Sequence, residues 1–126
     1  MLKDYAEVTR YFDNAKEALS KTKIIENGRK YEDEKYVKTA CGVAYNGVLK
    51  ALDIYFANKD IMSPRGRKSV EYYINNLAKQ NKKALSIFDD VYRLLHLYGY
   101  YDGTTNVKVI KEGFERAKEL INILKK

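Results

Sequence analysis

Arg93 and His96 are the residues whose types and spacing most suggest chemistry. They lie in the segment Tyr92-Arg-Leu-Leu-His-Leu-Tyr-Gly-Tyr-Tyr-Asp-Gly103, which contains the single histidine and four of the twelve tyrosines. Three residues apart on a helix, they would lie on neighbouring turns of one surface. The histidine could then act as a general base while the arginine stabilises a phosphate in the transition state. A lone histidine favours the other interpretation, a ring packed beside Leu95 and the tyrosines.

Tyr98, Tyr100 and Tyr101 surround Gly99, where this helix is expected to end. Exposed tyrosines there could stack on nucleic-acid bases, a contact worth about 1–3 kcal/mol per base. Buried tyrosines would instead lock the helix end and the turn at Asp102-Gly103, and this structural role is favoured. With Arg93 and His96, the three tyrosines form the candidate binding surface.

The densest basic cluster is Ser63-Pro-Arg-Gly-Arg-Lys-Ser69, just before an expected helix start that Ser63 could cap. Arg65, Arg67 and Lys68 are the candidate phosphate contacts, because backbone N–H groups and the helix dipole favour anions there. No Walker or dinucleotide-binding motif is present, so a flexible basic loop is the default interpretation. The formal charge of +7 favours anionic partners, but 17 acidic residues are interspersed with the 24 basic ones.

The remaining reactive residue types predict no metal site and no cofactor. Asp89 and Asp90 are sequence neighbours, so on a helix they would point about 100° apart and cooperate poorly. Cys41 is the single cysteine and lies in an apolar run, which indicates a buried, inert thiol. A single cysteine also excludes an intramolecular disulfide and a cysteine-based zinc site.

The elements that position these residues are expected to be helices nearly throughout, because apolar residues recur three and four positions apart. The first helix is expected to begin at Asp4, with Glu7 as capping-box partner, and to end at Asn27-Gly28. A helix over about 33–58 is apolar on most sides, so it is the predicted centre of the fold. Gly42 and Gly47 in its interior indicate close approach of a neighbouring backbone.

Two further helices are predicted between Val70 and Tyr98, separated by a kink or break at Asn81. The last helix begins near Asn106 and carries a heptad-like seam, made of Ile110, Phe114, Ala117, Ile121 and Leu124. This seam could pack on the bundle or pair with another subunit. The predicted fold is an all-α, antiparallel bundle of four to five helices in one domain, residues 1–126. The chain shows no signal peptide and no membrane span, so a cytoplasmic protein is expected.

The order of motifs resembles a small family of uncharacterised bacterial proteins, over nearly the whole chain. The likeness rests on Tyr36-Val-Lys-Thr-Ala-Cys-Gly-Val-Ala-Tyr45, Arg67-Lys-Ser-Val-Glu-Tyr-Tyr73 and Leu95-His-Leu-Tyr-Gly-Tyr-Tyr-Asp-Gly103. In overall design that family is similar to the HEPN superfamily, helical bundles found beside minimal nucleotidyltransferases and in RNA-cleaving toxins. RNA-cleaving HEPN proteins separate an arginine and a histidine by four to six residues. Here only two residues separate Arg93 from His96, so the resemblance implies the bundle without the nuclease motif.

Two functions follow from these observations. The leading hypothesis is a non-enzymatic helical interaction module that self-associates, either through its tyrosines or through the seam of the last helix. The alternative is a HEPN-like protein that binds nucleotide or RNA and acts with a nucleotidyltransferase or a toxin–antitoxin partner. A further protein partner and a nucleic acid are both compatible with the sequence.

Overall fold

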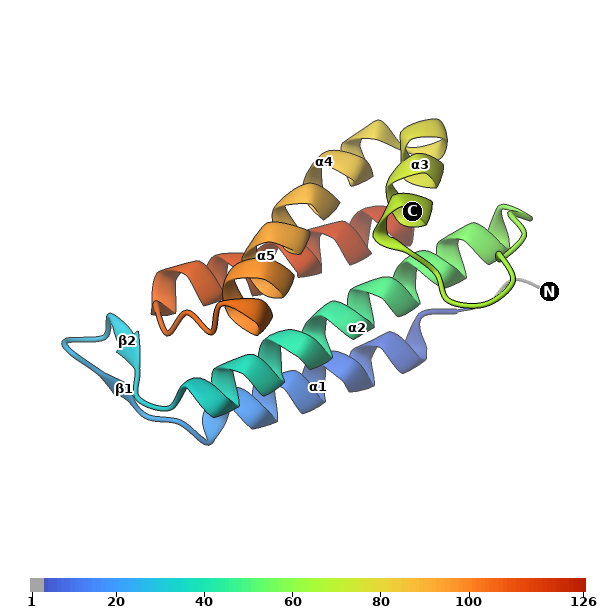
Figure 1. Ribbon diagram of the computed structural model, residues 1–126. Helices are drawn as coiled ribbons and strands as arrows, with labels where there is room; N and C mark the ends of the chain where they lie inside the picture. Colours follow the sequence, from blue (N-terminus) through green and yellow to red (C-terminus); the bar gives the residue numbers. More distant parts are fainter. Residues whose placement is uncertain (1–3) are drawn as a thin grey trace.

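The computed structural model describes residues 4–126, which form a bundle of helices with one small β-hairpin (Figure 1). The elements, in chain order, are α1 (Ala6–Ser20), β1 (Ile24–Ile25), β2 (Lys30–Tyr31), α2 (Glu34–Asn58), α3 (Val70–Gln80), α4 (Lys82–Val91), the π-helix η1 (Tyr92–Tyr101) and α5 (Val107–Leu124). The predicted all-α bundle is therefore confirmed. No helix within residues 4–126 is long and apolar enough to cross a membrane.

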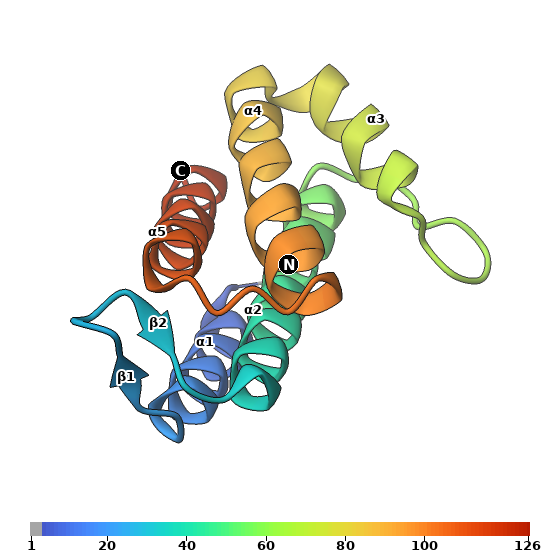
Figure 2. The same cartoon turned by 60° about the vertical axis from the view of Figure 1, so that its left-hand side comes forward.

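Helix α2 is the centre of the bundle, as its all-round apolar pattern predicts (Figure 2). It buries residues on most of its sides, including Val37, Ala44, Leu52 and Phe56. Helix α1 runs along one side of it, while α4, η1 and α5 cover the other. A helix without a broad polar face is stable only when neighbours cover it in this way. The glycines of α2 receive side chains rather than the expected backbone: Tyr100 at Gly42 and Tyr11 at Gly47.

Side-chain caps mark the starts of the helices after α1. Asp33 accepts a hydrogen bond of 2.9 Å from the Lys35 N–H, and Asn106 accepts one of 3.1 Å from the Val109 N–H. Asn81 separates α3 from α4 as predicted, and its side chain caps α4. The expected cap at Ser63 is wrong, because Ser69 accepts the hydrogen bond from the first turn of α3. A capping oxygen satisfies N–H groups that have no partner inside the helix.

The first helix ends earlier than predicted, at Ser20 rather than at Asn27-Gly28. Residues 26–28 form the turn of the β1–β2 hairpin, and all three have positive φ angles, from 52° to 86°. Glycine and asparagine tolerate this left-handed conformation in a hairpin turn as well as after a helix, so the pattern is ambiguous. At the start of α1, Asp4 accepts from the Ala6 N–H, whereas Glu7 lies 3.7 Å from Lys50 of α2.

The helix after α4 does not end at Gly99, contrary to the sequence prediction. From Tyr92 the α-helix widens into a π-helix, which continues to Tyr101 with Gly99 buried inside it. Its last turn closes with a hydrogen bond of 2.9 Å from the Asp102 N–H to the Leu97 carbonyl, five residues earlier. The positive φ that a helix terminus favours falls at Gly103 instead.

The seam of α5 packs inside the bundle. Ile110, Ala117 and Leu124 are buried against α2 and α4. Of the two roles that the heptad spacing allows, these residues have the first, packing on the bundle. Phe114 is only partly buried and, with Ile121, lines a groove beside α1. The seam therefore serves mainly the core of one chain.

Candidate functional site

The π-helix η1 carries every residue of the predicted binding surface. It lies between α2 and α5 and approaches both closely. Gly99 lies against Cys41 of α2, and Leu95 lies against Gly113 of α5, so that a methyl group added at either glycine would collide with its neighbour. Long π-helices are rare, and π-helical turns are frequent at functional sites. The geometry of η1 therefore decides which side chains can act together.

His96 lies within a cluster of tyrosine rings. Its imidazole is stacked on Tyr45 of α2 with 4.6 Å between the ring centroids, and on Tyr92 at 5.2 Å. Tyr100 stacks on it at 6.0 Å, and Tyr101 meets it edge-on at 5.6 Å. Partial burial lowers the pKa of His96, because desolvation disfavours the charged imidazolium. This is the packed histidine that the sequence favours.

Arg93 is held by two carboxylates of α4. Its guanidinium donates to Asp90 at 2.6 Å and lies 3.4 Å from Asp89. The Asp89 carboxylate, and to a smaller extent that of Asp90, raises the pKa of Arg93. Asp90 also lies 3.5 Å from Arg116 of α5, which joins the two helices. Asp89 and Asp90 thus both bind one guanidinium, although they were not expected to cooperate in holding a metal ion.

The structure does not bring Arg93 and His96 together. Arg93 faces the ion pairs between α4 and α5, whereas His96 faces Tyr45 of α2. In the wide π-helix, neighbours along the surface are four and five residues apart, so a three-residue spacing separates side chains. Tyr98, five residues after Arg93, contributes to the field at its guanidinium. The predicted five-residue surface is therefore two surfaces.

One of these surfaces presents exposed aromatic rings. We call His96, Tyr100 and Tyr101 the tyrosine face; Tyr100 is 49% exposed and Tyr101 is 69% exposed. Tyr98, 41% exposed, belongs to the other side with Arg93. The favoured expectation of buried tyrosines is therefore wrong for the outer rings. The part of the cluster that is buried is Tyr45, a residue of α2 that sequence spacing alone does not connect with η1.

The basic loop before α3 is only partly free to bind a phosphate. Lys68 forms an ion pair of 3.0 Å with Asp53 of α2, which also accepts a hydrogen bond of 2.9 Å from the Tyr73 hydroxyl. Arg65 and Arg67 remain exposed. This loop follows the end of α2, whereas the tyrosine face lies near Gly42 (Figure 1). Lys68 of the loop contacts Asp53, which lies eleven residues of helix, about 16 Å, from Gly42.

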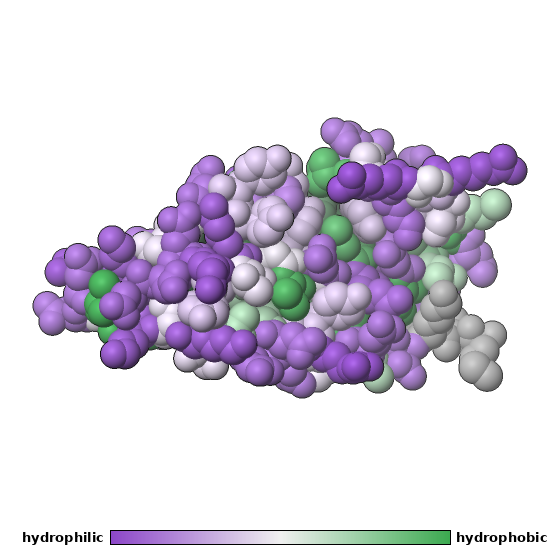
Figure 3. All heavy atoms as spheres, turned by 60° about the horizontal axis from the view of Figure 1, so that its bottom comes forward, coloured by the Kyte–Doolittle hydropathy of each residue, from purple (hydrophilic) through white to green (hydrophobic). Residues whose placement is uncertain are grey.

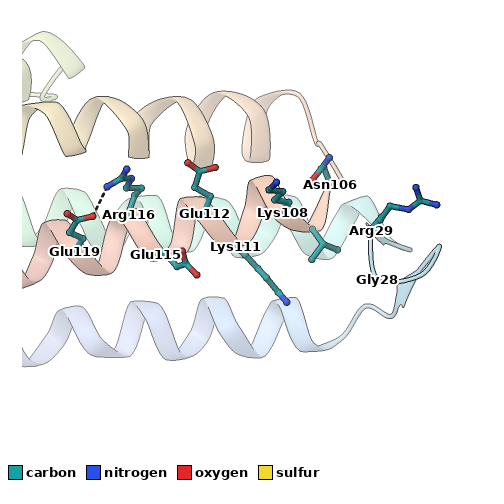
Figure 4. A pocket seen from close by; sticks show the side chains of 10 residues that line it. Gly28, Arg29, Asn106, Lys108, Lys111, Glu112, Glu115, Arg116 and Glu119 are labelled. Atoms are coloured by element: carbon teal, nitrogen blue, oxygen red, sulfur yellow. Dashed lines mark hydrogen bonds and ion pairs between the residues drawn. The ribbon is translucent and has the colours of Figure 1, made fainter.

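A groove of about 770 Å³ lies between the β-hairpin and α5 (Figure 4). The groove carries both signs of charge: Arg29, Lys108 and Lys111 lie near the hairpin, and Glu112, Glu115, Arg116 and Glu119 follow along α5. Lys111 points towards α1, while Arg116 is held by Glu119 at 2.7 Å. Mixed charges of this kind neutralise one another and select neither an anion nor a cation.

Two further sequence predictions concern reactive groups. Cys41 is fully buried, and burial raises the pKa of its thiol to about 12, so that it stays protonated at neutral pH. Residues 4–126 contain no cluster of histidine, cysteine, aspartate or glutamate suited to a metal ion. A second groove, between α1 and α5, is lined in part by apolar residues, among them Phe114 and Ile121 of the predicted seam.

Comparisons with known proteins extend over these same elements. Residues 3–126 match a family described as a domain of unknown function, DUF5618. A solved structure, a protein of unknown function from Dyadobacter fermentans, is 43% identical to this chain with a TM-score of 0.80. The similarity covers 95% of this chain and 91% of that one. No curated protein matches the chain. The match of almost the whole chain, helices and tyrosine face included, shows that this protein belongs to the DUF5618 family.

Proposed function

We propose that this protein is a non-enzymatic helical interaction module that self-associates through the tyrosine face of η1. The observation that carries the proposal is the exposure of Tyr101 and Tyr100 beside His96. Tyrosine combines a large apolar ring with a polar hydroxyl, and it is enriched where proteins contact one another. A ring that is already stacked on its neighbours also has little conformational freedom left to lose on association.

The remainder of the surface supports this choice of interface. Most of the apolar seam of α5 is used inside the bundle, so little of it is free to pair with a second copy. The face turned forward in Figure 3 is mostly hydrophilic, and its hydrophobic side chains form only small, separate patches. The proposal that the module is non-enzymatic draws on the separation of Arg93 from His96 and on the engagement of Arg93 with Asp89 and Asp90.

Sedimentation velocity over a range of protein concentrations tests self-association. We expect concentration-dependent formation of a dimer or larger oligomer, and a shift towards monomer in Tyr101→Ser. Tyr98→Ser is the matched control, because it removes an exposed tyrosine from the same helix on the other side. A wild-type protein that remains monomeric at high concentration would refute the proposal. Equal effects of the two substitutions would place the interface elsewhere.

The alternative is a HEPN-like protein that binds RNA or a nucleotide and acts with a nucleotidyltransferase or a toxin–antitoxin partner. It is supported by the exposed rings of Tyr100 and Tyr101 and by the exposed Arg65 and Arg67. These groups lie at different parts of the surface, with about 16 Å of helix between Gly42 and Asp53, so a single strand that spans both is a better ligand than a mononucleotide.

Binding of a fluorescent single-stranded RNA at low and at physiological salt distinguishes the alternative. Phosphate contacts predict an affinity that falls steeply as salt rises, and base stacking predicts weaker binding in Tyr101→Ser. Absence of binding at low salt would remove the alternative. If the protein cleaves RNA and His96→Ala abolishes cleavage, the non-enzymatic assignment is wrong.

A further inference from the structure

The groove between α1 and α5 is an apolar surface that the proposed self-association does not use. Tyr5, Val8 and Phe12 of α1 line one side of it, and Phe114 and Ile121 of α5 line the other. Its volume is about 300 Å³, the space of about ten liquid waters. Water on such apolar walls is readily displaced by apolar side chains, which makes the groove a docking surface.

The groove has the length of a short helix. Helices α1 and α5 are antiparallel, and the Tyr5 hydroxyl donates to the Leu124 carbonyl at 3.3 Å, which joins the two helices at one end. From Tyr5 to Lys16 the groove follows α1 for eleven residues, about 16 Å. Three turns of an amphipathic helix have this length and present apolar anchors at positions i, i+4 and i+7.

The rim of the groove is positively charged along its whole length. Its charged residues are Lys16, Lys118 and Lys125, with Asp13 as the single acid. With Tyr5 beside Leu124, Lys125 lies at one end, Lys118 is central and Lys16 lies towards the other end. None of the three lysines forms an ion pair with any of residues 4–126. The rim therefore offers three separate cations to an occupant.

We propose that this groove binds an acidic amphipathic helix of a partner protein. Apolar residues on one face of the helix would fill the groove, while acidic residues on its flanks would meet the three lysines. A second copy of this chain would match the three lysines poorly, because its 17 acidic residues are interspersed with 24 basic ones and offer no purely acidic helix face. A fatty acid has one carboxylate and would use a single lysine, whereas the spaced lysines match acids on successive turns.

Selection from a phage-displayed library of random 16-residue peptides on the full-length protein tests the proposal without prior choice of ligand. We expect enriched peptides with apolar residues at helical spacing and an excess of aspartate and glutamate. Thr9→Trp places a large ring in the groove from an exposed position and should abolish binding of these peptides. Asn122→Trp should block the groove from the α5 side, and it replaces Thr9→Trp as the test if the circular dichroism spectrum shows that Thr9→Trp is misfolded.

Fluorescence anisotropy with one enriched peptide measures the role of charge. Lys118→Glu should weaken binding about fivefold or more, as expected for loss of an exposed charge pair. Lys108→Glu is the matched control on the same helix, because it lies outside the groove, and it should change the affinity less than about twofold.

Three results would overturn the proposal. One is a selection that enriches no peptide, or peptides without an acidic excess. Another is binding that survives both Thr9→Trp and Asn122→Trp. The third is binding of sodium laurate that Thr9→Trp blocks while no peptide binds, which would assign the groove to a single-headed anionic lipid.

Discussion

Replacement of Gly99 by alanine should destabilise the protein, although alanine is the better helix former. Gly99 is buried inside η1, where it packs against Cys41 of α2. A methyl group built on Gly99 would collide with Cys41, meeting its Sγ and, at 2.9 Å, its Cβ. Cys41 is fully buried in the first half of α2, so it cannot move outwards into solvent.

Two opposing terms set the size of the effect. In a helix interior alanine is favoured over glycine by about 1 kcal/mol. Overpacking of a dense core costs about 1–3 kcal/mol, and contact with an immobile residue places this site in the upper part of that range. The expected net loss is therefore about 1–2 kcal/mol in the free energy of unfolding. In urea this should lower the midpoint by about 0.5–1 M.

Urea unfolding followed by circular dichroism at 222 nm measures the loss. Gly42→Ala is the matched control, because its added methyl group meets the ring of Tyr100, which is half exposed and can shift outwards by a small amount. We expect the stability of Gly42→Ala to stay within about 1 kcal/mol of wild type. Cys41→Gly combined with Gly99→Ala should destabilise less than the sum of the single changes. A Gly99→Ala protein as stable as wild type would refute the account of the contact with α2.

Three further predictions concern single side chains. Burial lowers the pKa of His96, so the unfolded chain takes up a proton at a higher pH than the folded one, and stability should fall as the pH drops below about 6.5. Urea midpoints measured from pH 5 to 8 should show this fall in the wild type and lose it in His96→Gln. Asp53→Ala leaves the Tyr73 hydroxyl and Lys68 without their partner and should cost about 1–3 kcal/mol, and a thermal melt unchanged from wild type would contradict this. Because Cys41 is buried and its pKa is raised, it should react with a thiol reagent at pH 8 only as fast as the protein unfolds. Urea should accelerate this labelling, whereas rapid labelling of the native protein would show that the thiol is accessible.

Helix identity was predictable because it depends on short-range patterns. The apolar surface of α2 and the helix starts near residues 33 and 106 are readable from neighbouring residues, and each is found where its pattern places it. The end of α1 was not predictable in this way, because residues with a positive φ such as Asn27 and Gly28 occur in hairpin turns as well as at helix ends. The hairpin is held by contacts distant in sequence, such as the 2.9 Å hydrogen bond from the Tyr31 N–H to the Thr105 carbonyl.

The sequence by itself determined that this chain is a helical bundle around α2, and it singled out the residues of η1 as a distinctive segment. It did not determine which of those residues share a surface. An α-helix would place Arg93 and His96 on neighbouring turns, whereas the observed π-helix places Arg93 with Tyr98 and His96 with Tyr100. Local preferences distinguish the two helices weakly, and the packing of Gly99 on α2 and of Leu95 on α5 decides between them. The tyrosine face is therefore a product of the tertiary structure.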